Sequence, residues 1–202
     1  MVKVSKITNT TSASTPEADI LLAQIETLAH TKTANCYQCG KCTAGCPVSE
    51  HMELMPNQIV RLLQLGRADK ALRSSSIWKC VSCLTCSTRC PQEVDPAALM
   101  DALRQLSLEQ GIASLEAQPV IAFQKAFLEN VRRNGRLHEL ELIALFKGAV
   151  VFGSRQLSFL FKDAMLAPQL MKRKKLHLAQ ERSEDREVVA RIYARCIKTG
   201  EK

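Results

Sequence analysis

The sequence predicts an all-α protein, on three observations: the spacing of its apolar residues, its helix start signals and its helix stop signals. Apolar residues recur at intervals of three and four, as they do on one face of a helix. Asp95 and Pro96 form a strong start signal, because aspartate caps a helix and proline suits its first position. Gly66, Gly111 and Gly135 each follow a periodic segment, and we expect helices to end near them.

The expected helices follow a polar, Ser/Thr-rich arm at residues 1–15. The first helix begins at Pro16 and carries Leu21, Leu22, Ile25, Leu28 and Ala29 on one side. Further helical segments are expected over residues 57–73, 96–111, 120–135, 137–146, 158–166 and 184–197.

Eight of the nine cysteines fall into two copies of one pattern, C-x2-C-x2-C-x3-C-P, offset by 44 residues. This pattern is the ligand run of a two-cluster bacterial-type ferredoxin, in which the fourth cysteine of each run binds the other cluster. The sequence therefore predicts two [4Fe-4S] clusters with crossed ligation. Their expected ligands are Cys36, Cys39, Cys42 and Cys90 for the first cluster, and Cys80, Cys83, Cys86 and Cys46 for the second.

Zinc and disulfides are the alternatives for these cysteines. A zinc site joins two Cys-x2-Cys pairs across a loop, whereas here a third cysteine follows each pair at the same spacing and Cys-Pro closes each run. Disulfide frameworks belong to small secreted domains, and residues 1–30 lack the design of a signal peptide. We expect reduced thiols in a cytoplasmic protein, in a setting low in oxygen.

The net charge of +8 lies in the C-terminal part: residues 117–202 hold 17 basic and 9 acidic side chains, whereas residues 1–116 hold 11 of each. The basic run at residues 172–175 is interpreted first as a solvated helix face, second as a docking surface for an acidic partner, and only then as a site for nucleic acid or anionic lipid. The most apolar stretch, 140–161, is interrupted by Lys147 and Arg155, so it falls short of the ~20 apolar residues that a membrane-spanning helix needs.

The other residues whose side chains could bind a cofactor or take part in catalysis are assigned to packing or to the surface, and no catalytic residue is predicted. Trp78 is expected in the core, and Gly40 and Gly45 suit a tightly folded loop. Methionines are expected to pack near the clusters, with thioether ligation as the open alternative: Met52, Met55 and Met100. The histidines are not spaced as metal ligands: His30, His51, His138 and His177. Cys196 lacks neighbouring cysteines.

The strings CYQCGKCTAGCP at residues 36–47 and WKCVSC at residues 78–83, with the helical spacer between them, closely resemble the C subunit of heterodisulfide reductase. The resemblance covers about residues 35–105 and implies the α-helical ferredoxin fold. In that family the C subunit holds two [4Fe-4S] clusters and passes single electrons from a flavin-containing A subunit to a B subunit that performs the disulfide chemistry. It implies a non-catalytic electron-transfer subunit with A-like and B-like partners in a hetero-oligomeric complex.

The expected domains are the arm at 1–15, an α-helical ferredoxin domain at 16–112, and a helical, basic extension at 113–202 for subunit docking. A competing interpretation is the iron-sulfur subunit of a membrane-associated dehydrogenase of the succinate, glycerol-3-phosphate or glycolate type. Such chains often carry a [2Fe-2S] domain or Cys-Cys-Gly segments, and this sequence has neither. A third class, a basic nucleic-acid-binding module, lacks a recognition motif here.

Overall fold

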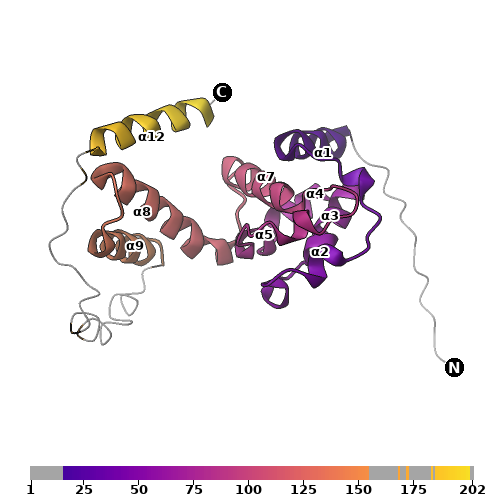
Figure 1. Cartoon of the computed structure of the whole chain (residues 1–202), viewed down its shortest axis with the longest axis horizontal. Helices are drawn as coiled ribbons and strands as arrows, with labels where there is room; N and C mark the ends of the chain where they lie inside the picture. Colours follow the sequence, from indigo (N-terminus) through magenta and orange to yellow (C-terminus); the bar gives the residue numbers. More distant parts are fainter. Residues whose placement is uncertain (1–15, 155–167, 169–171, 173–182, 184, 201–202) are drawn as a thin grey trace. The chain divides into compact units, whose positions relative to one another are not determined.

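The described residues form helices joined by turns and loops, with no strand among them (Figure 1). The computed structural model describes residues 16–154, 168, 172, 183 and 185–200. The all-α prediction is confirmed. The chain divides into two compact units, Met1–Ala117 (unit 1) and Gln118–Lys202 (unit 2). The division falls a few residues after the boundary expected at 112, and the roles assigned to the two parts remain predictions.

Unit 1 consists of short helices around a small apolar core. Its described elements are α1 (Pro16–Ala29), η1 (Thr33–Asn35), α2 (Lys41–Ala44), η2 (Ser49–His51), α3 (Pro56–Gln64), α4 (Ala68–Arg73), α5 (Ser76–Lys79), α6 (Thr85–Thr88), α7 (Pro96–Glu109) and η3 (Leu115–Ala117). The helical segment expected over 57–73 contains two helices, α3 and α4, and α3 ends just before Gly66, as expected.

The core of unit 1 forms where α1, α3, α4 and α5 pack against α7. Each contributes side chains that are buried almost completely, and these include Ile25, Ile59, Leu63, Leu72, Ile77, Leu99, Leu103 and Leu106. Trp78 is also buried, as expected. Burial of a large apolar side chain is worth about 1.5–3 kcal/mol. This core fixes the positions of the two loops that carry the cysteines, because α5 leads into one loop and α3 and α7 follow the loops.

The helix α7 begins and ends at the signals predicted from the sequence, Asp95 and Gly111. Asp95 Oδ1 accepts a 2.9 Å hydrogen bond from the backbone N–H of Ala98, so Asp95 is the N-cap. At the other end Gly111 takes a left-handed conformation with φ 65°. The N–H of Ile112 then donates to the carbonyl of Ser107 at 3.1 Å, which closes the helix.

Unit 2 contains α8 (Gln118–Asn134), α9 (Glu139–Ser154) and α12 (Arg186–Gly200), and α8 packs against both of the others. The loop after α8 is held by Asn130, which is fully buried. Asn130 Nδ2 donates to the carbonyl of His138 at 3.1 Å, and Asn130 Oδ1 accepts from the N–H of His138 at 2.7 Å. Gly135 lies in this turn with φ 72°.

Two of the helices expected in the C-terminal part have different bounds in the structure. The helix expected over 137–146 extends to Ser154, because the apolar run continues past Gly148 without a stop signal. The helix expected over 184–197 begins at Arg186 and ends at Gly200. The helix expected over 158–166, the arm at 1–15 and most of the basic run at 172–175 lie outside the described residues. None of the described helices has the length and apolar character needed to cross a bilayer.

Candidate metal centres

The two cysteine motifs fold with the same backbone conformation, although only one of them has a glycine at the critical turn. In the first motif Gln38 and Gly40 have φ 65° and 76°, and α2 follows. In the second motif Ser82 and Leu84, 44 residues later, have φ 50° and 62°, and α6 follows. The internal repeat seen in the sequence is thus a repeat of structure.

Each motif contributes cysteines to two pockets. One pocket, named site 1, is lined by Cys36, Cys39, Cys42 and Cys90. The other, named site 2, is lined by Cys46, Cys80, Cys83 and Cys86. The structure therefore brings all eight sequence-predicted site residues to two pockets, with three cysteines of one motif and the last cysteine of the other at each. Cys196 lies in unit 2 and lines neither pocket.

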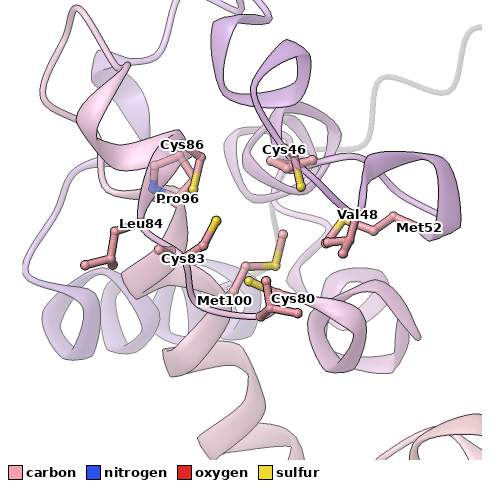
Figure 2. A pocket seen from close by; sticks show the side chains of 12 residues that line it. Cys46, Val48, Met52, Cys80, Cys83, Leu84, Cys86, Pro96 and Met100 are labelled. Carbon is pink, nitrogen blue, oxygen red and sulfur yellow. The ribbon is translucent and has the colours of Figure 1, made fainter.

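Figure 2 shows that the sulfurs of the four cysteines of site 2 point toward a common space. They surround this space rather than meet at one point: in the described part of the chain, no three His, Cys, Asp or Glu side chains converge as a single metal ion would require. The thioether of Met100 reaches the same space from α7, and Leu84 lies at its edge beside Cys83 (Figure 2). Site 2 thus has room at its centre for a group larger than one ion.

The rest of the lining of site 2 is apolar. It consists of Val48, Met52, Pro56, Val81, Leu84, Pro96, Ala97 and Met100. Met52 and Met100 pack beside the cysteines, as expected, whereas Met55 is exposed and does not line either pocket. Met52, Ala97 and Met100 are buried, whereas Val81 and Leu84 are more than half exposed, so the lining limits water on one side of the site only.

Site 1 has polar side chains around its cysteines: Gln38, Lys41 and Asn57 line it together with Gly40, Val60, Val94 and Pro96. Gln38 Nε2 lies 3.4 Å from Cys36 Sγ and donates to it. Asn57 is oriented by Thr43, whose hydroxyl donates to Asn57 Oδ1 at 2.6 Å. The two pockets therefore share a cysteine arrangement and differ in the residue types beside the cysteines, since Gln38, Lys41 and Asn57 line site 1 only.

The loop of site 1 is anchored to the core by Gln64 of α3. Gln64 Nε2 donates to the carbonyls of Thr33 and Cys36, at 2.9 and 2.7 Å. Its Oε1 accepts from Gln38 Nε2 at 3.4 Å, so the amide that reaches Cys36 is itself held in place. No signal in the sequence pointed to Gln64, because its contacts are to backbone 28 and 31 residues away.

The loop of site 2 is anchored by Arg104 of α7 and by Asp95. Arg104 donates to the carbonyls of Ile77 and Cys80, at 2.6 and 2.9 Å. The hydroxyl of Ser87, next to Cys86, donates to Asp95 Oδ1. The N-cap of α7 thus also fixes the second motif, a role that the capping signal alone did not predict.

The thiols differ in their acidity according to their surroundings. Burial raises the pKa of Cys42 and of Cys86. The backbone N–H of Lys41 lowers the pKa of the exposed Cys39, assisted by the Tyr37 hydroxyl and the Lys41 charge. The hydroxyl and then the N–H of Thr85 lower the pKa of the exposed Cys83. Each site thus has one exposed thiol with a lowered pKa and one partly buried thiol with a raised pKa.

Comparisons with known proteins agree with this arrangement. Residues 32–94 match the family described as 4Fe-4S dicluster domain. The iron-sulfur C subunit of CoB–CoM heterodisulfide reductase from Methanopyrus kandleri is 36% identical over 88 residues, which is 44% of this chain and 46% of that protein. The C subunit of the ferredoxin:CoB–CoM heterodisulfide reductase of Methanosarcina acetivorans is 39% identical over 77 residues, 38% of this chain and 31% of that protein.

A further relative, the second iron-sulfur C subunit of CoB–CoM heterodisulfide reductase from Methanocaldococcus jannaschii, is 32% identical over 105 residues. That match covers 52% of this chain and 56% of the relative, so the chain spans about half or less of the length of these three relatives. The resemblance to the heterodisulfide reductase C subunit is confirmed over the cysteine-bearing part.

The donors present fit two [4Fe-4S] clusters, which are the cofactors of this domain. Each site offers four cysteine sulfurs, the soft anionic ligands that such clusters require. The zinc interpretation is set aside, because the matched family is defined by iron-sulfur clusters.

Proposed function

We propose that this chain, whose residues 32–94 are a 4Fe-4S dicluster domain, is the electron-transfer subunit of a heterodisulfide reductase-like complex in the cytoplasm. It would accept single electrons from a flavin-containing A-like subunit and deliver them to a catalytic B-like subunit. The observation that carries the proposal is the pair of four-cysteine pockets within a stretch that is similar to three curated C subunits. That similarity favours this function over a dehydrogenase subunit.

We assign Cys36, Cys39, Cys42 and Cys90 as the ligands of one cluster, and Cys46, Cys80, Cys83 and Cys86 as the ligands of the other. The lining of the two pockets supports this crossed assignment. When bound, the clusters supply one-electron transfer at fixed positions. The chain itself contributes the thiolates, the apolar lining that limits water at site 2, and the exposure of Cys39 and Cys83, which places one edge of each site at the surface.

Cysteine substitution tests the ligand assignment. Anaerobically purified chain should contain about eight iron and eight sulfide, following from two cubanes. Cys46→Ser should alter the spectrum of the cluster at site 2 and leave that of site 1 largely native. Cys196→Ser is the matched control and should lose no iron, because Cys196 lies in unit 2. A Cys46→Ser chain that loses the cluster of its own motif instead would contradict the crossed assignment.

Reconstitution tests the relay. A reduced flavin-containing A-like subunit should reduce the clusters of this chain, and a B-like subunit should reoxidise them. Omitting the chain, or supplying it without iron, should abolish electron flow between the other two. Undiminished flow in its absence, or disulfide reduction by the isolated chain, would overturn the relay.

A further inference from the structure

The structural repeat allows the two sites to be compared position by position. Several residues around the cysteines differ between the motifs: Tyr37, Gln38, Gly40 and Lys41 of the first motif correspond to Val81, Ser82, Leu84 and Thr85 of the second. The first residues of the helices that follow the motifs also differ between the two sites. Pro56 and Pro96 begin α3 and α7, and the next residues, which line sites 1 and 2, are Asn57 and Ala97. The amide of Asn57 and the charge of Lys41 at site 1 thus have no counterpart of the same kind in the lining of site 2.

Leu84 occupies a conformation that costs energy. Its φ of 62° is left-handed, and a residue with a Cβ in this region is less stable by about 1–2 kcal/mol. A glycine would avoid this cost, as Gly40 does at the corresponding position with φ 76°. The side chain of Leu84 is 55% exposed, so it gains little from burial, yet it lines site 2 beside Cys83 (Figure 2). Strain held at such a place indicates a functional role for the side chain.

Lys41 is the cation of site 1. It lines that pocket, whereas the corresponding Thr85 does not line site 2. Thr85 offers site 2 only a hydroxyl, 3.4 Å from Cys83 Sγ. In the described part of the chain no carboxylate lies within ion-pair distance of Lys41. Its charge is therefore available to a negatively charged group in the pocket.

Two arginines outside the pocket lining lie near the cysteines of site 2: Arg89, whose guanidinium lies against Gly45 next to Cys46, and Arg104. Arg104 differs from Lys41 in its contacts. Its guanidinium pairs with Asp101 at 3.1 Å and donates to the carbonyl of Cys80 rather than to a sulfur. Arg104 does not line the pocket. Because Asp101 offsets the positive charge of Arg104, Arg104 does not give site 2 the net positive charge that Lys41 gives site 1.

We infer that the two sites hold their clusters at different reduction potentials, with site 1 the easier to reduce, and that Lys41 and Leu84 set the difference. The inference rests on the cluster ligation proposed above. Reduction adds one electron, and thus one negative charge, to a cluster, with no bond made or broken. The charge of Lys41 stabilises that added charge at site 1, whereas Leu84 disfavours it at site 2. Hydrogen-bonding groups lie near sulfurs at both sites and do not distinguish them. An electron that enters at site 2 therefore moves on to site 1.

The experiment is a redox titration of the full, cluster-loaded chain with dithionite and mediators, followed by electron paramagnetic resonance. The wild-type clusters should titrate as two separate one-electron steps. Lys41→Thr, which installs the residue of the second motif, should lower the higher potential and leave the lower one in place. Lys70→Thr removes an exposed charge from α4 that lines neither pocket, and should move neither potential.

Exchange of the turn residues tests Leu84 separately. Leu84→Gly should raise the lower potential, and since it also removes the strain it should not reduce stability. Gly40→Leu is the reciprocal change: open space surrounds the position of its Cβ, and it should lower the higher potential. Thr85→Lys should raise the lower potential toward the higher one.

The outcomes separate this inference from the ligand assignment. Two clusters that are fully loaded but titrate together overturn the inference alone, and so does a Lys41→Thr chain whose lower potential shifts instead. A wild-type chain that lacks about eight iron and eight sulfide overturns the ligation and the inference together.

Discussion

Asp95 connects the start of α7 to the second cysteine loop through hydrogen bonds. Its carboxylate caps α7 through the N–H of Ala98 and accepts from the hydroxyl of Ser87, next to Cys86. Its backbone N–H donates to Thr31 Oγ1 at 3.2 Å, so the residue also contacts the loop after α1. Loss of this one carboxylate therefore affects both the helix and the second cysteine loop.

Asp95→Ala should lower the free energy of unfolding of unit 1 by about 1–2 kcal/mol, the cost of losing an N-cap. The loop of site 2 should loosen as well, since Ser87 loses its acceptor. Asp95→Asn keeps a side-chain oxygen and should lose much less. The measurement is chemical denaturation of the loaded chain, together with the rate of iron release to a chelator. Equal stability of the Ala and Asn variants would contradict the capping role.

Among the described residues of unit 2, Glu129 has a strongly lowered pKa. The Arg132 side chain, which donates at 2.7 and 2.6 Å, lowers the pKa of Glu129 to about 2, and Arg133 adds to the effect. A carboxylate with a depressed pKa stabilises the fold above its unfolded-state pKa and stops doing so as the pH falls through the folded value. The stabilisation of unit 2 by ionised Glu129 should thus be complete above about pH 4.5 and lost as the pH falls toward 2.

Glu129→Gln should cost unit 2 about 0.2–1 kcal/mol at pH 7, because pairs near the surface are weakened by solvent. The difference in unfolding free energy between wild type and variant should shrink as the pH falls from 4.5 to 2. Denaturation followed by circular dichroism at several pH values measures it. A difference that stays constant over this range would show that the ion pairs are not its source.

At the scale of elements, the close approach of α12 to the turn after α8 depends on Gly135. A Cβ at this position would lie 2.8 Å from Arg186 Cα, a backbone atom that cannot move aside alone. The left-handed φ of 72° adds its own cost. The contact between α8 and α12 therefore requires a residue without a side chain.

Gly135→Ala should destabilise unit 2 by more than the ~1–2 kcal/mol of the backbone conformation alone. Gly148→Ala is the matched control: Gly148 lies inside α9, with open space around its Cβ position. It should stabilise the helix by about 0.5–1 kcal/mol. Thermal unfolding of the two variants should shift in opposite directions, and a shift in the same direction would refute the close-approach explanation.

For the whole molecule, the sequence predicted most of what the local chemistry determines. The cysteine spacing identified the cofactor and the two sets of cysteines that line the pockets, and the signals at Asp95, Gly66 and Gly111 located helix ends correctly. It did not predict Gln64 and Arg104, because they act through backbone carbonyls far away in the sequence. Nor did it predict the left-handed Leu84, since residue preference argues against a leucine there.

The division between the units also allows a test of the docking role proposed for the extension. Because the cysteine sites and their core lie in Met1–Ala117, a chain that ends at Ala117 should keep both clusters and about eight iron. It should fail to join the A-like and B-like subunits and should not support electron flow. Co-purification and turnover measure this. A truncated chain that assembles and turns over fully would assign docking to unit 1.

The sharing of cysteines between the motifs has a consequence for biosynthesis. Each pocket takes its fourth sulfur from the other motif, so the cysteines of site 2 are complete only when the chain has been synthesised through Cys86, and those of site 1 only when it has been synthesised through Cys90. A ribosome-bound fragment that ends after the first motif can offer only an incomplete set of thiols. With the ligands proposed above, we expect cluster delivery to follow translation of both motifs, because neither motif alone offers a full set of four thiols.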